Sequence, residues 1–316
     1  MNYKGNVTIV GAGAMGSFYG SLLHQAGCDV QLLDIWQDHI DKINSHGLHL
    51  TRPNGTTDTI DMKAYHVDRP ASDQADLLIV FVDTNSLDQV LPILKPLLNE
   101  TGYVLTLQNG IGNVEKLLGP LGVGRVVAGT SMHSCELLSP GHIRHVISGT
   151  TVLGEITGNR VSERVHDLAK LIATNSSQTE AVGNVVPHIW SKLVINCAIN
   201  PLCALTGLLP GQLQEVEETK RLQAQIVSEI EALCTAKEII LPEDAPIKEV
   251  WRKSRGGNNK PSMVQHLERG RKTEIDALNG AVSRMATEVG LAAPINATIT
   301  SLIKGLEKTC PANTDD

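Results

Sequence analysis

Aromatic residues are scarce in this chain, at 3% of 316 residues, with only two Phe, three Trp and four Tyr. The core must therefore be filled by aliphatic side chains, and few rings are left for the stacking platforms that bind single-stranded nucleic acid. The formal net charge is −7, which disfavours contact with a phosphate backbone. We therefore predict no nucleic-acid partner.

Long apolar runs are also lacking, although 41% of the residues are hydrophobic and 19% are charged. This composition predicts a soluble globular protein that neither spans a membrane nor stays disordered. The N-terminus leads almost directly into a strand-like run at residues 6–10, which leaves no room for a signal peptide. At about 150 residues per domain, the length predicts two domains.

Cysteine patterns that would indicate a disulfide scaffold or a metal site are missing. The six cysteines form no C-x-x-C pair, so we expect a reducing, cytoplasmic location. His142 and His145 are close in sequence but have no Cys or carboxylate at ligand spacing, and we predict no metal site. No G-x-S-x-G nucleophile motif occurs either.

Strand-like and helix-like segments alternate in the first half of the chain. Strands are predicted at residues 6–10, 29–34, 77–82, 103–107 and 126–128. Helices are predicted after Gly16 as far as Ala26, and at residues 87–98 and 114–118. This alternation is typical of α/β proteins with a doubly wound parallel sheet. Residues 142–147 and 150–153 look like a hairpin that closes this domain.

Beyond about Gly183 the strand patterns vanish. Residues 187–206, 215–237 and 273–289 have long helical patterns, and residues 255–261 form a glycine-rich break between them. We therefore predict a dinucleotide-binding Rossmann-type domain at residues 1–182 and an all-helical substrate and catalytic domain at residues 183–316.

A glycine-rich turn follows the first strand and opens the first helix. In a G-x-G-x-x-G turn the first glycine allows the tight bend, the second lets the backbone approach a pyrophosphate, and the third lets the helix pack on the strand. The alternative is a glycine turn without a ligand. The predicted cofactor-binding residues of this turn are Gly11, Ala12, Gly13, Ala14, Met15 and Gly16.

Asp34 ends the second strand, 18 residues beyond Gly16, where the adenosine ribose lies in dinucleotide-binding folds. Its carboxylate can accept hydrogen bonds from ribose hydroxyls and would repel a 2′-phosphate. We therefore predict that NAD(H) is favoured over NADP(H). The alternative is an ordinary turn carboxylate at the end of a strand.

Lys192, Asn196 and Asn200 fall at positions i, i+4 and i+8 of a predicted helix and share one face. An ammonium and two carboxamides on a buried face need polar partners, which a ligand with a carboxylate, a carbonyl and hydroxyls can supply. The alternative is a solvated helix face.

Three further segments, together with the glycine turn, resemble the ketopantoate reductase (2-dehydropantoate 2-reductase) family, including its NAD-dependent D-2-hydroxyacid dehydrogenase branch. They are LQNGIGN at residues 107–113, WSKLVINCAINPL at residues 190–202, and PSM at residues 261–263 followed by TEID at residues 273–276. The resemblance covers nearly the whole chain, and it implies NADP(H) as the usual cofactor and a place in pantothenate biosynthesis.

The resemblance also implies roles for single residues. Lys192 matches the family's proton donor, and Glu274 matches a glutamate near the cofactor that holds the ammonium in place. Asn109 matches a residue between cofactor and substrate, and the resemblance therefore implies that Asn109 and Glu274 also contact the cofactor. The predicted substrate-binding residues are Asn109, Asn196, Asn200 and Ser262. An exposed helix carboxylate is the alternative for Glu274.

Two positions depart from the family pattern. Asp83 stands where the family usually has a lysine, after its fourth strand, and Pro210 stands where some members have a substrate-binding Asn. Asp83 either lines the cofactor crevice or caps the helix that begins near Ser86. Both leave the reaction type unchanged but leave the identity of the 2-oxo acid open.

These observations predict an oxidoreductase that transfers a hydride from a nicotinamide cofactor to a small 2-oxo acid, with ketopantoate reduced to D-pantoate by family default. One alternative is an NAD-dependent D-2-hydroxyacid dehydrogenase for another branched or bulky 2-oxo acid. The other is an NAD(H)-binding sensor without turnover. The sequence leaves the oligomeric state open, with a homodimer as one option.

Overall fold

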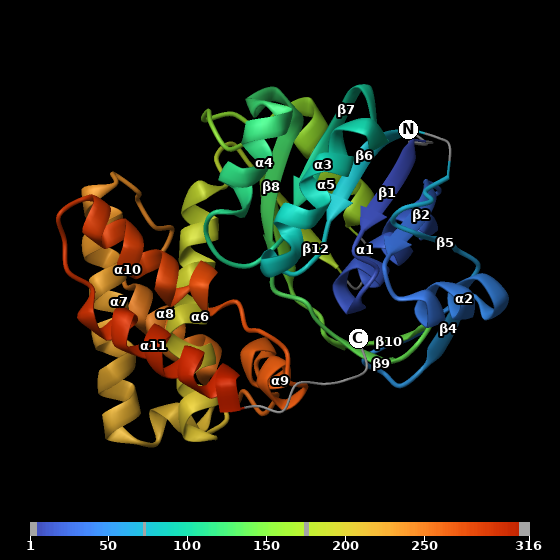
Figure 1. The fold of residues 1–316 in the computed structure, drawn as a ribbon. Coiled ribbons are helices and arrows are strands. Elements are labelled where there is room, and N and C mark those ends of the chain that lie inside the picture. Colours follow the sequence, from blue (N-terminus) through green and yellow to red (C-terminus); the bar gives the residue numbers. More distant parts are fainter. Residues whose placement is uncertain (1–4, 72–73, 174–176, 310–316) are drawn as a thin grey trace. The chain divides into compact units, whose positions relative to one another are not determined.

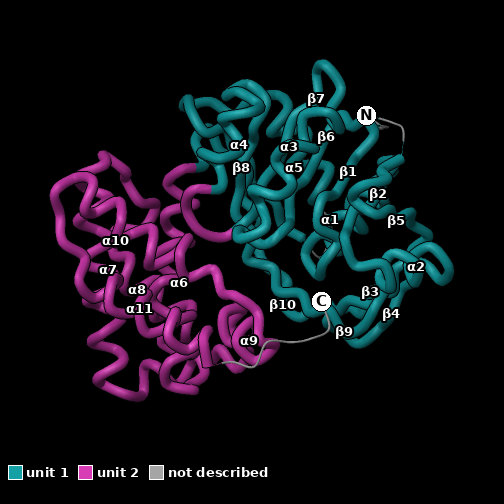
Figure 2. The backbone as a smooth tube through the Cα atoms, viewed as in Figure 1, with its two compact units in different colours: residues 1–108, 113–185 teal, residues 109–112, 186–316 magenta. Residues whose placement is uncertain are grey.

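The computed structural model describes residues 5–71, 74–173 and 177–309. The chain divides into two compact units (Figure 2). An α/β unit comprises Met1–Gln108 and Asn113–Val185, and a helical unit comprises Val186–Asp316 together with the short segment Asn109–Gly112. That segment leaves the α/β part of the chain and packs with residues more than 70 positions later.

An eight-stranded sheet forms the centre of the α/β unit (Figure 1), in the order β12-β11-β8-β7-β6-β1-β2-β5. The run from β8 to β5 is parallel, whereas β11 pairs with β8 in the antiparallel sense. Its strands are β1 (Asn6–Val10), β2 (Asp29–Asp34), β5 (Lys63–His66), β6 (Ala75–Val80), β7 (Leu98–Thr106), β8 (Val126–Ser131), β11 (Thr150–Gly154) and β12 (Gln178–Val182).

Both faces of this sheet are covered, and the strand sequences show why. Neighbouring residues of β1 point to opposite faces, so Ile9 joins one core and Val10 the other. In β6, Ile79 and Val80 divide in the same way. Helices α1 (Ala14–Gln25) and α5 (Glu163–Ile172) supply the first core, and α3 (Leu87–Leu97) and α4 (Asn113–Leu121) the second. Continuous apolar strands are the expected result of two-sided burial.

The predicted hairpin of residues 142–147 and 150–153 is wrong. The first segment is β10 (His142–Ile147), which belongs to a second sheet with the order β4-β3-β10-β9, whereas the second segment is β11 of the large sheet. The chain passes from one sheet to the other at Gly149, where an added Cβ would lie 2.2 Å from the Met132 carbonyl oxygen. The residue pattern of a segment predicts that it forms a strand, but not which strand it pairs with. The pairing of β10 and β11 was therefore predicted wrongly.

Strands β5 and β12 of the large sheet and helix α5 were not predicted from the sequence. The other elements of the α/β unit that were not predicted are three strands of the second sheet and one further helix. They are β3 (Leu48–Thr51), β4 (Thr57–Ile60), β9 (Ser134–Ser139) and helix α2 (Gln37–His46). The strands are short and carry many polar residues, as in the sequence LHLT of β3. Short 3₁₀ turns lie at η1 (Thr84–Ser86) and η2 (Val123–Arg125).

All elements of residues 186–309 are helical. They are α6 (Val186–Thr206), η3 (Gln212–Gln214), α7 (Glu217–Ala236), α8 (Pro246–Ser254), α9 (Ser262–Glu268), η4 (Ile275–Ala277), α10 (Asn279–Glu288) and α11 (Pro294–Thr309). The predicted single helix over residues 273–289 is wrong, because Leu278 has φ −103° and ψ −109° and separates η4 from α10.

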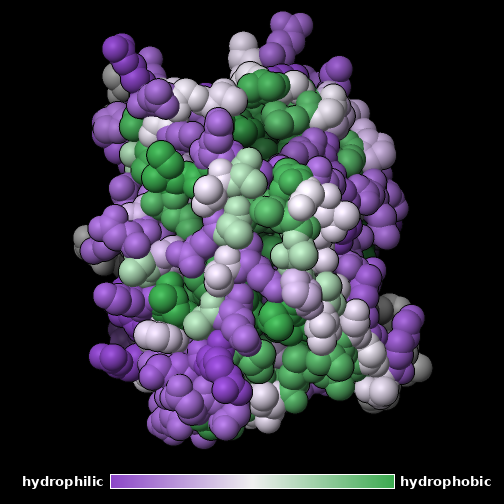
Figure 3. Space-filling model, turned by 90° about the vertical axis from the view of Figure 1, so that its left-hand side faces the viewer, coloured by the Kyte–Doolittle hydropathy of each residue, from purple (hydrophilic) through white to green (hydrophobic). Residues whose placement is uncertain are grey.

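Helix α6 is the one helix of the described residues that is long and apolar enough to cross a membrane by length and composition. Half of its most apolar 18-residue window is buried inside the protein, and it packs against α7, α8, α9 and α11. These contacts are those of a core helix. On the face drawn in Figure 3, hydrophobic and hydrophilic residues are interspersed.

A buried amide network compensates for a proline inside α6. Pro201 has no N–H, so the Cys197 carbonyl oxygen one turn earlier loses its helical hydrogen bond. Asn279 of α10 supplies the missing donor, with Nδ2 3.2 Å from that oxygen, and also donates to Asn296 Oδ1 at 2.9 Å. Asn296 in turn donates to Glu229 Oε2 at 2.7 Å. Asn279 therefore connects α6, α10 and α11.

We expect Asn279→Ala to lower the free energy of unfolding by about 2–4 kcal/mol, because it leaves two buried carbonyl oxygens without a donor. Denaturant titration of the variant measures this loss. Asn258→Ala, at an exposed loop position, is the matched control. A loss for Asn279→Ala no larger than that of the control would contradict the assigned role.

Candidate functional site

The glycine-rich turn joins β1 to α1 in a strained and crowded geometry. Gly11 has φ +97°, and an added Cβ there would lie 2.7 Å from Val82 N. A Cβ on Gly16 would lie 1.9 Å from the Gly11 carbonyl oxygen. Only glycine fits these two positions, since an L side chain would force the strand and helix apart.

Gly13 differs from the other two glycines, because an added Cβ would meet no atom within 4 Å. It is the N-cap of α1, so the free N–H groups of the first helical turn follow it directly. Open space beside a helix N-terminus with small, half-buried residues suits an anionic ligand. The turn therefore fits the pyrophosphate of a dinucleotide.

Asp34 lies at the end of β2 with its carboxylate held by backbone amides. Oδ2 accepts from Ala12 N at 2.7 Å, and Oδ1 accepts from Ile35 N at 2.8 Å and Trp36 N at 3.0 Å. The carboxylate thus braces the glycine turn, as the turn-carboxylate alternative requires. A carboxylate has about four acceptor positions, so one is left for a ligand hydroxyl.

His39 is a part of this region that the sequence did not indicate. Its Nδ1 accepts from Gly141 N at 2.9 Å, which makes Nε2 the protonated nitrogen that donates to the Ala12 carbonyl oxygen at 2.9 Å. Ser17 Oγ donates to the same oxygen at 2.6 Å. Burial lowers the pKa of His39, so the ring is neutral and the Ala12 peptide is fixed on both sides.

Lys192, Asn196 and Asn200 lie along α6, as their spacing predicted. Asn200 is 9% exposed, and Lys192 and Asn196 are half-buried. Burial lowers the pKa of Lys192 to about 8, against the opposing effect of the Glu274 carboxylate, which raises it. A lysine with this pKa can give up its proton near neutral pH.

Glu274 is linked to the segment 109–112 as well as to Lys192. Asn109 Nδ2 donates to Glu274 Oε2 at 3.2 Å. Beside it, Ile111 N donates to the Ala277 carbonyl oxygen at 2.9 Å, and a Cβ on Gly110 would lie 2.6 Å from that oxygen. The helical unit thus brings Asn109, Lys192 and Glu274, which are far apart in sequence, into one interacting set.

Ser262 begins α9, which packs against α6, and its side chain is half-buried. Pro210 is buried beside Gly257, where an added Cβ would lie 3.0 Å from the proline ring. Within the described residues, no group of three or more His, Cys, Asp or Glu side chains could hold a metal ion.

Asp83 is exposed at the start of η1, and its side chain makes no capping hydrogen bond there. It follows β6, which is paired in parallel with β1, and the backbone of Phe81 and Val82 abuts Gly11. Asp83 is therefore the next residue in sequence after Phe81 and Val82, through which the loop after β6 contacts the glycine turn. The carboxyl ends of such strands are the usual ligand-binding edge.

We expect Asp83→Lys to lower the KM for the cofactor several-fold, because it replaces a charge that repels phosphates by one that attracts them. The melting temperature should stay unchanged, since no capping bond is lost. Steady-state kinetics and thermal unfolding measure both quantities. An unchanged KM with a lowered melting temperature would show that Asp83 acts only as a helix cap.

The doubly wound sheet with its glycine turn, and the helical unit with its half-buried lysine, define a two-unit oxidoreductase with a dinucleotide-binding fold. The chain belongs to the ketopantoate reductase family. Residues 7–158 match the family description "Ketopantoate reductase PanE/ApbA", and residues 184–307 match "Ketopantoate reductase PanE/ApbA C terminal". The family and the fold class predicted from the sequence are thereby confirmed.

Individual relatives span almost the full length of both chains. A 2-dehydropantoate 2-reductase of Lactococcus lactis is 30% identical over 307 residues, which cover 96% of this chain and 98% of the relative. A ternary structure of D-mandelate dehydrogenase with NADH and anilino(oxo)acetate has a TM-score of 0.90 and 28% identity, covering 96% and 99% of the two chains. A ketopantoate reductase structure from Ralstonia eutropha JMP134 has a TM-score of 0.87 and 30% identity, with 96% and 99% covered.

Proposed function

We propose that this protein reduces the carbonyl group of a small 2-oxo acid to a D-2-hydroxy acid with a nicotinamide cofactor, and that ketopantoate is the first substrate to test. The observation that carries the proposal is the set formed by Lys192, Glu274 and Asn109, in which Asn109 donates to Glu274 at 3.2 Å and Glu274 raises the pKa of the half-buried Lys192 against the effect of burial. A half-buried cation beside two carboxamides on one helix suits an anionic substrate with a reducible carbonyl.

Residues of the α/β unit would hold the cofactor. The N–H groups at the start of α1 would bind the pyrophosphate, for which Gly13 leaves space, and Asp34 would accept a hydrogen bond from a ribose hydroxyl. When bound, the reduced nicotinamide supplies a hydride. Asp34 favours NAD(H), whereas the family default is NADP(H), and the NADH in the D-mandelate dehydrogenase structure supports the first choice.

Residues of the helical unit would activate the carbonyl. As the carbonyl carbon accepts the hydride, negative charge develops on the oxygen, and the Lys192 ammonium stabilises it and transfers a proton to it. Lys192 is left as a neutral amine, which solvent reprotonates. Glu274 stabilises the ammonium form before the transfer, and Asn109 orients Glu274 through its hydrogen bond. Asn196, Asn200 and Ser262 would bind the carboxylate and hydroxyl groups of the substrate.

A second candidate is an NAD-dependent D-2-hydroxyacid dehydrogenase for a bulkier 2-oxo acid. The similarity to D-mandelate dehydrogenase favours it, as do Asp34 and the loss of a family asparagine at Pro210. An NAD(H) sensor without turnover is the remaining alternative. A sensor without turnover would not require a lysine whose pKa is lowered and which interacts with Glu274.

A panel of 2-oxo acids separates these candidates. We would follow the loss of NADH and NADPH absorbance with ketopantoate, with other branched 2-oxo acids and with phenylglyoxylate. A highest kcat/KM for ketopantoate supports the first candidate, and a highest value for a bulkier acid supports the second. Cofactor binding without oxidation by any acid would contradict both and favour the sensor.

The reaction should depend on pH through Lys192. The proton donor must be protonated, and burial lowers the pKa of Lys192 to about 8. We therefore expect kcat/KM for reduction to be constant below this pKa and to fall tenfold per pH unit above it, since kcat/KM reports the free enzyme. A pH profile that stays level through this pKa would contradict the assignment of Lys192.

A further inference from the structure

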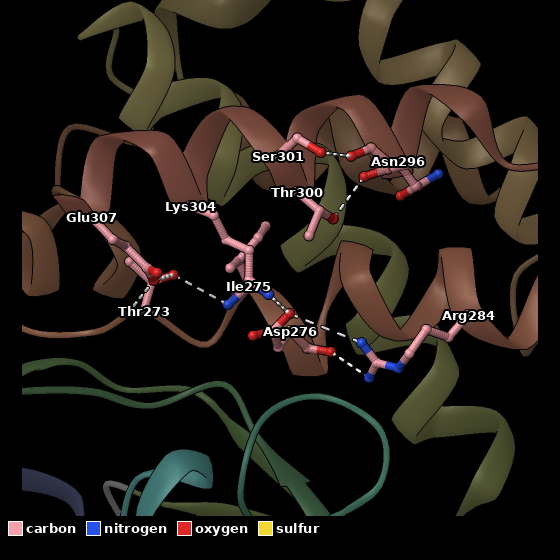
Figure 4. A network of polar contacts seen from close by, with 10 residues as sticks. Thr273, Ile275, Asp276, Arg284, Asn296, Thr300, Ser301, Lys304 and Glu307 are labelled. Carbon is pink, nitrogen blue, oxygen red and sulfur yellow. Dashed lines mark hydrogen bonds and ion pairs between the residues drawn. The ribbon is translucent and has the colours of Figure 1, made fainter.

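Helix α11 reaches the segment that carries Glu274 through two charged side chains. Figure 4 shows Glu307 and Lys304 extending from α11 toward Thr273 and Asp276. We propose that Glu307 is a positioning residue that aims Glu274 at Lys192 by fixing the residues on either side of it. This inference rests on the proposed function, in which Lys192 is the proton donor.

One oxygen of Glu307 holds Thr273 by two hydrogen bonds. Thr273 N and Thr273 Oγ1 both donate to Glu307 Oε1, at 2.7 and 2.6 Å. Thr273 Oγ1 in turn accepts from Ile275 N at 3.2 Å. The residues before and after Glu274 are thus tied to a single carboxylate on α11. Hydrogen bonds to a charged acceptor are stronger than neutral ones, which suits an anchor.

The next residue, Asp276, has its own links to two helices. Lys304 Nζ of α11 lies 2.7 Å from Asp276 Oδ1, and Arg284 of α10 donates to the Asp276 carbonyl oxygen at 2.8 Å. This ion pair is exposed, with side chains 48% and 33% accessible, so it adds little stability. We therefore assign the main anchoring role to Glu307 and a lesser one to Lys304.

The backbone around Glu274 leaves its side chain few alternatives. Thr273 and Ile275 are buried, at 1% and 0% exposure, and the Glu274 carbonyl oxygen accepts from Ala277 N at 2.9 Å. A residue whose neighbours and carbonyl are all fixed can move only its side-chain torsions. Glu274 then keeps its hydrogen bond to Asn109 and its electrostatic interaction with Lys192.

The electrostatic interaction between Glu274 and Lys192 determines how the loss of Glu307 should affect proton transfer. Glu274 raises the pKa of Lys192 while burial lowers it, so a displaced Glu274 leaves burial unopposed. Loss of the Glu307 anchor should therefore lower the pKa of Lys192 and reduce the fraction of enzyme that holds the proton. The Kd of the cofactor should change little, because the glycine turn and Asp34, which supply most of the proposed cofactor contacts, belong to the α/β unit.

Four variants of the full-length protein test this role. Glu307→Ala removes the anchor, and Glu307→Gln keeps an oxygen that can accept both bonds from Thr273. Thr273→Val keeps the shape of a buried side chain but removes the hydroxyl, and it carries the test if Glu307→Ala does not fold. Ser301→Ala is the matched control, since the Ser301 hydroxyl on α11 donates only to a carbonyl of its own helix, at Ala297.

Two readouts separate positioning from mere stability. The first is the titration of Lys192, followed by the NMR shift of its ¹³C-labelled ε carbon and assigned by its absence in Lys192→Ala. The second is kcat for 2-oxo acid reduction beside the Kd for NADH. For Glu307→Ala and Thr273→Val we expect the Lys192 titration to move down by about 0.5 to 1 unit. At about pH 9, above the pKa of Lys192, kcat should then be reduced about 3- to 10-fold, while the Kd changes less than about twofold.

Glu307→Gln and Ser301→Ala should match the wild type within about twofold, as expected when acceptor geometry and fold are kept. A Glu307→Ala protein with a lowered melting temperature but wild-type Lys192 titration and kcat would overturn the inference, and so would a Glu307→Gln protein that behaves like Glu307→Ala. If instead Lys192→Ala stays active, the proposed function fails, while the NMR titration still shows whether Glu307 controls Lys192.

Discussion

We expect Lys192→Ala to lower kcat for 2-oxo acid reduction by about 10²- to 10⁴-fold, which is the usual contribution of a positioned general acid. The variant loses both the proton donor and the cation that stabilises the developing alkoxide. The Kd for NADH should hardly change, because the glycine turn and Asp34 belong to the α/β unit and Lys192 to the helical unit. Stopped-flow or steady-state kinetics and a fluorescence titration of NADH measure the two effects.

Two further variants make this result specific. Lys248→Ala removes an exposed lysine from α8 and should retain full activity. Lys192→Arg keeps the positive charge but cannot release a proton near neutral pH, so kcat should stay low while KM recovers in part. A Lys192→Ala protein with more than about a tenth of wild-type kcat would exclude Lys192 as the general acid.

The second large effect is a preference for NADH over NADPH of up to about a hundredfold in kcat/KM. Two like charges about 5 Å apart at an effective dielectric constant of about 20 repel each other by about 3 kcal/mol, and solvent screening reduces this value. The half-buried Asp34 carboxylate, held by three backbone amides, would impose this repulsion on a 2′-phosphate. Measuring kcat/KM with both cofactors tests it.

The matched pair Asp34→Asn and Asp38→Asn assigns the preference to one residue. Asp34→Asn removes the charge and should bring the two kcat/KM values to within a few-fold of each other. Asp38 lies four residues further on, exposed in the first turn of α2, and its substitution should leave the preference intact. Equal use of both cofactors by the wild type, or a preference for NADPH, would refute the role of Asp34.

The parts of the fold that could be predicted are those in which burial on both faces requires a run of apolar or β-branched residues. The strands of the large sheet are covered on both faces, so β6 is apolar from Leu77 to Val80 and β1 is rich in β-branched residues from Val7 to Val10. Strands β3 and β4 of the second sheet lack such an apolar run, because each is only four residues long and contains polar residues. The partner of β10 could not be predicted, because pairing depends on contacts far apart in the chain.

The site was predictable to a similar extent. The glycine turn and the spacing of Lys192, Asn196 and Asn200 are local, and the structure places the last three along α6. The side chains that hold these groups act over long separations, 102 residues between His39 and Gly141 and 34 between Thr273 and Glu307. Asn279 is another example, because its role depends on a proline in a different helix. Supporting residues of this kind show no signal in a single sequence.

The most direct test of the account is the fate of a labelled hydride. We would incubate the protein with ketopantoate and NADH that carries deuterium at the transferable C4 position, and analyse the product by mass spectrometry and NMR. We expect one deuterium on C2 of a D-2-hydroxy acid, formed in equal amount to NAD⁺, and formation at least about 10²-fold slower with Lys192→Ala. If phenylglyoxylate replaces ketopantoate as the better substrate, the same label should appear on C2 of its product. NADH oxidation with no deuterium on C2 of either product would contradict the account.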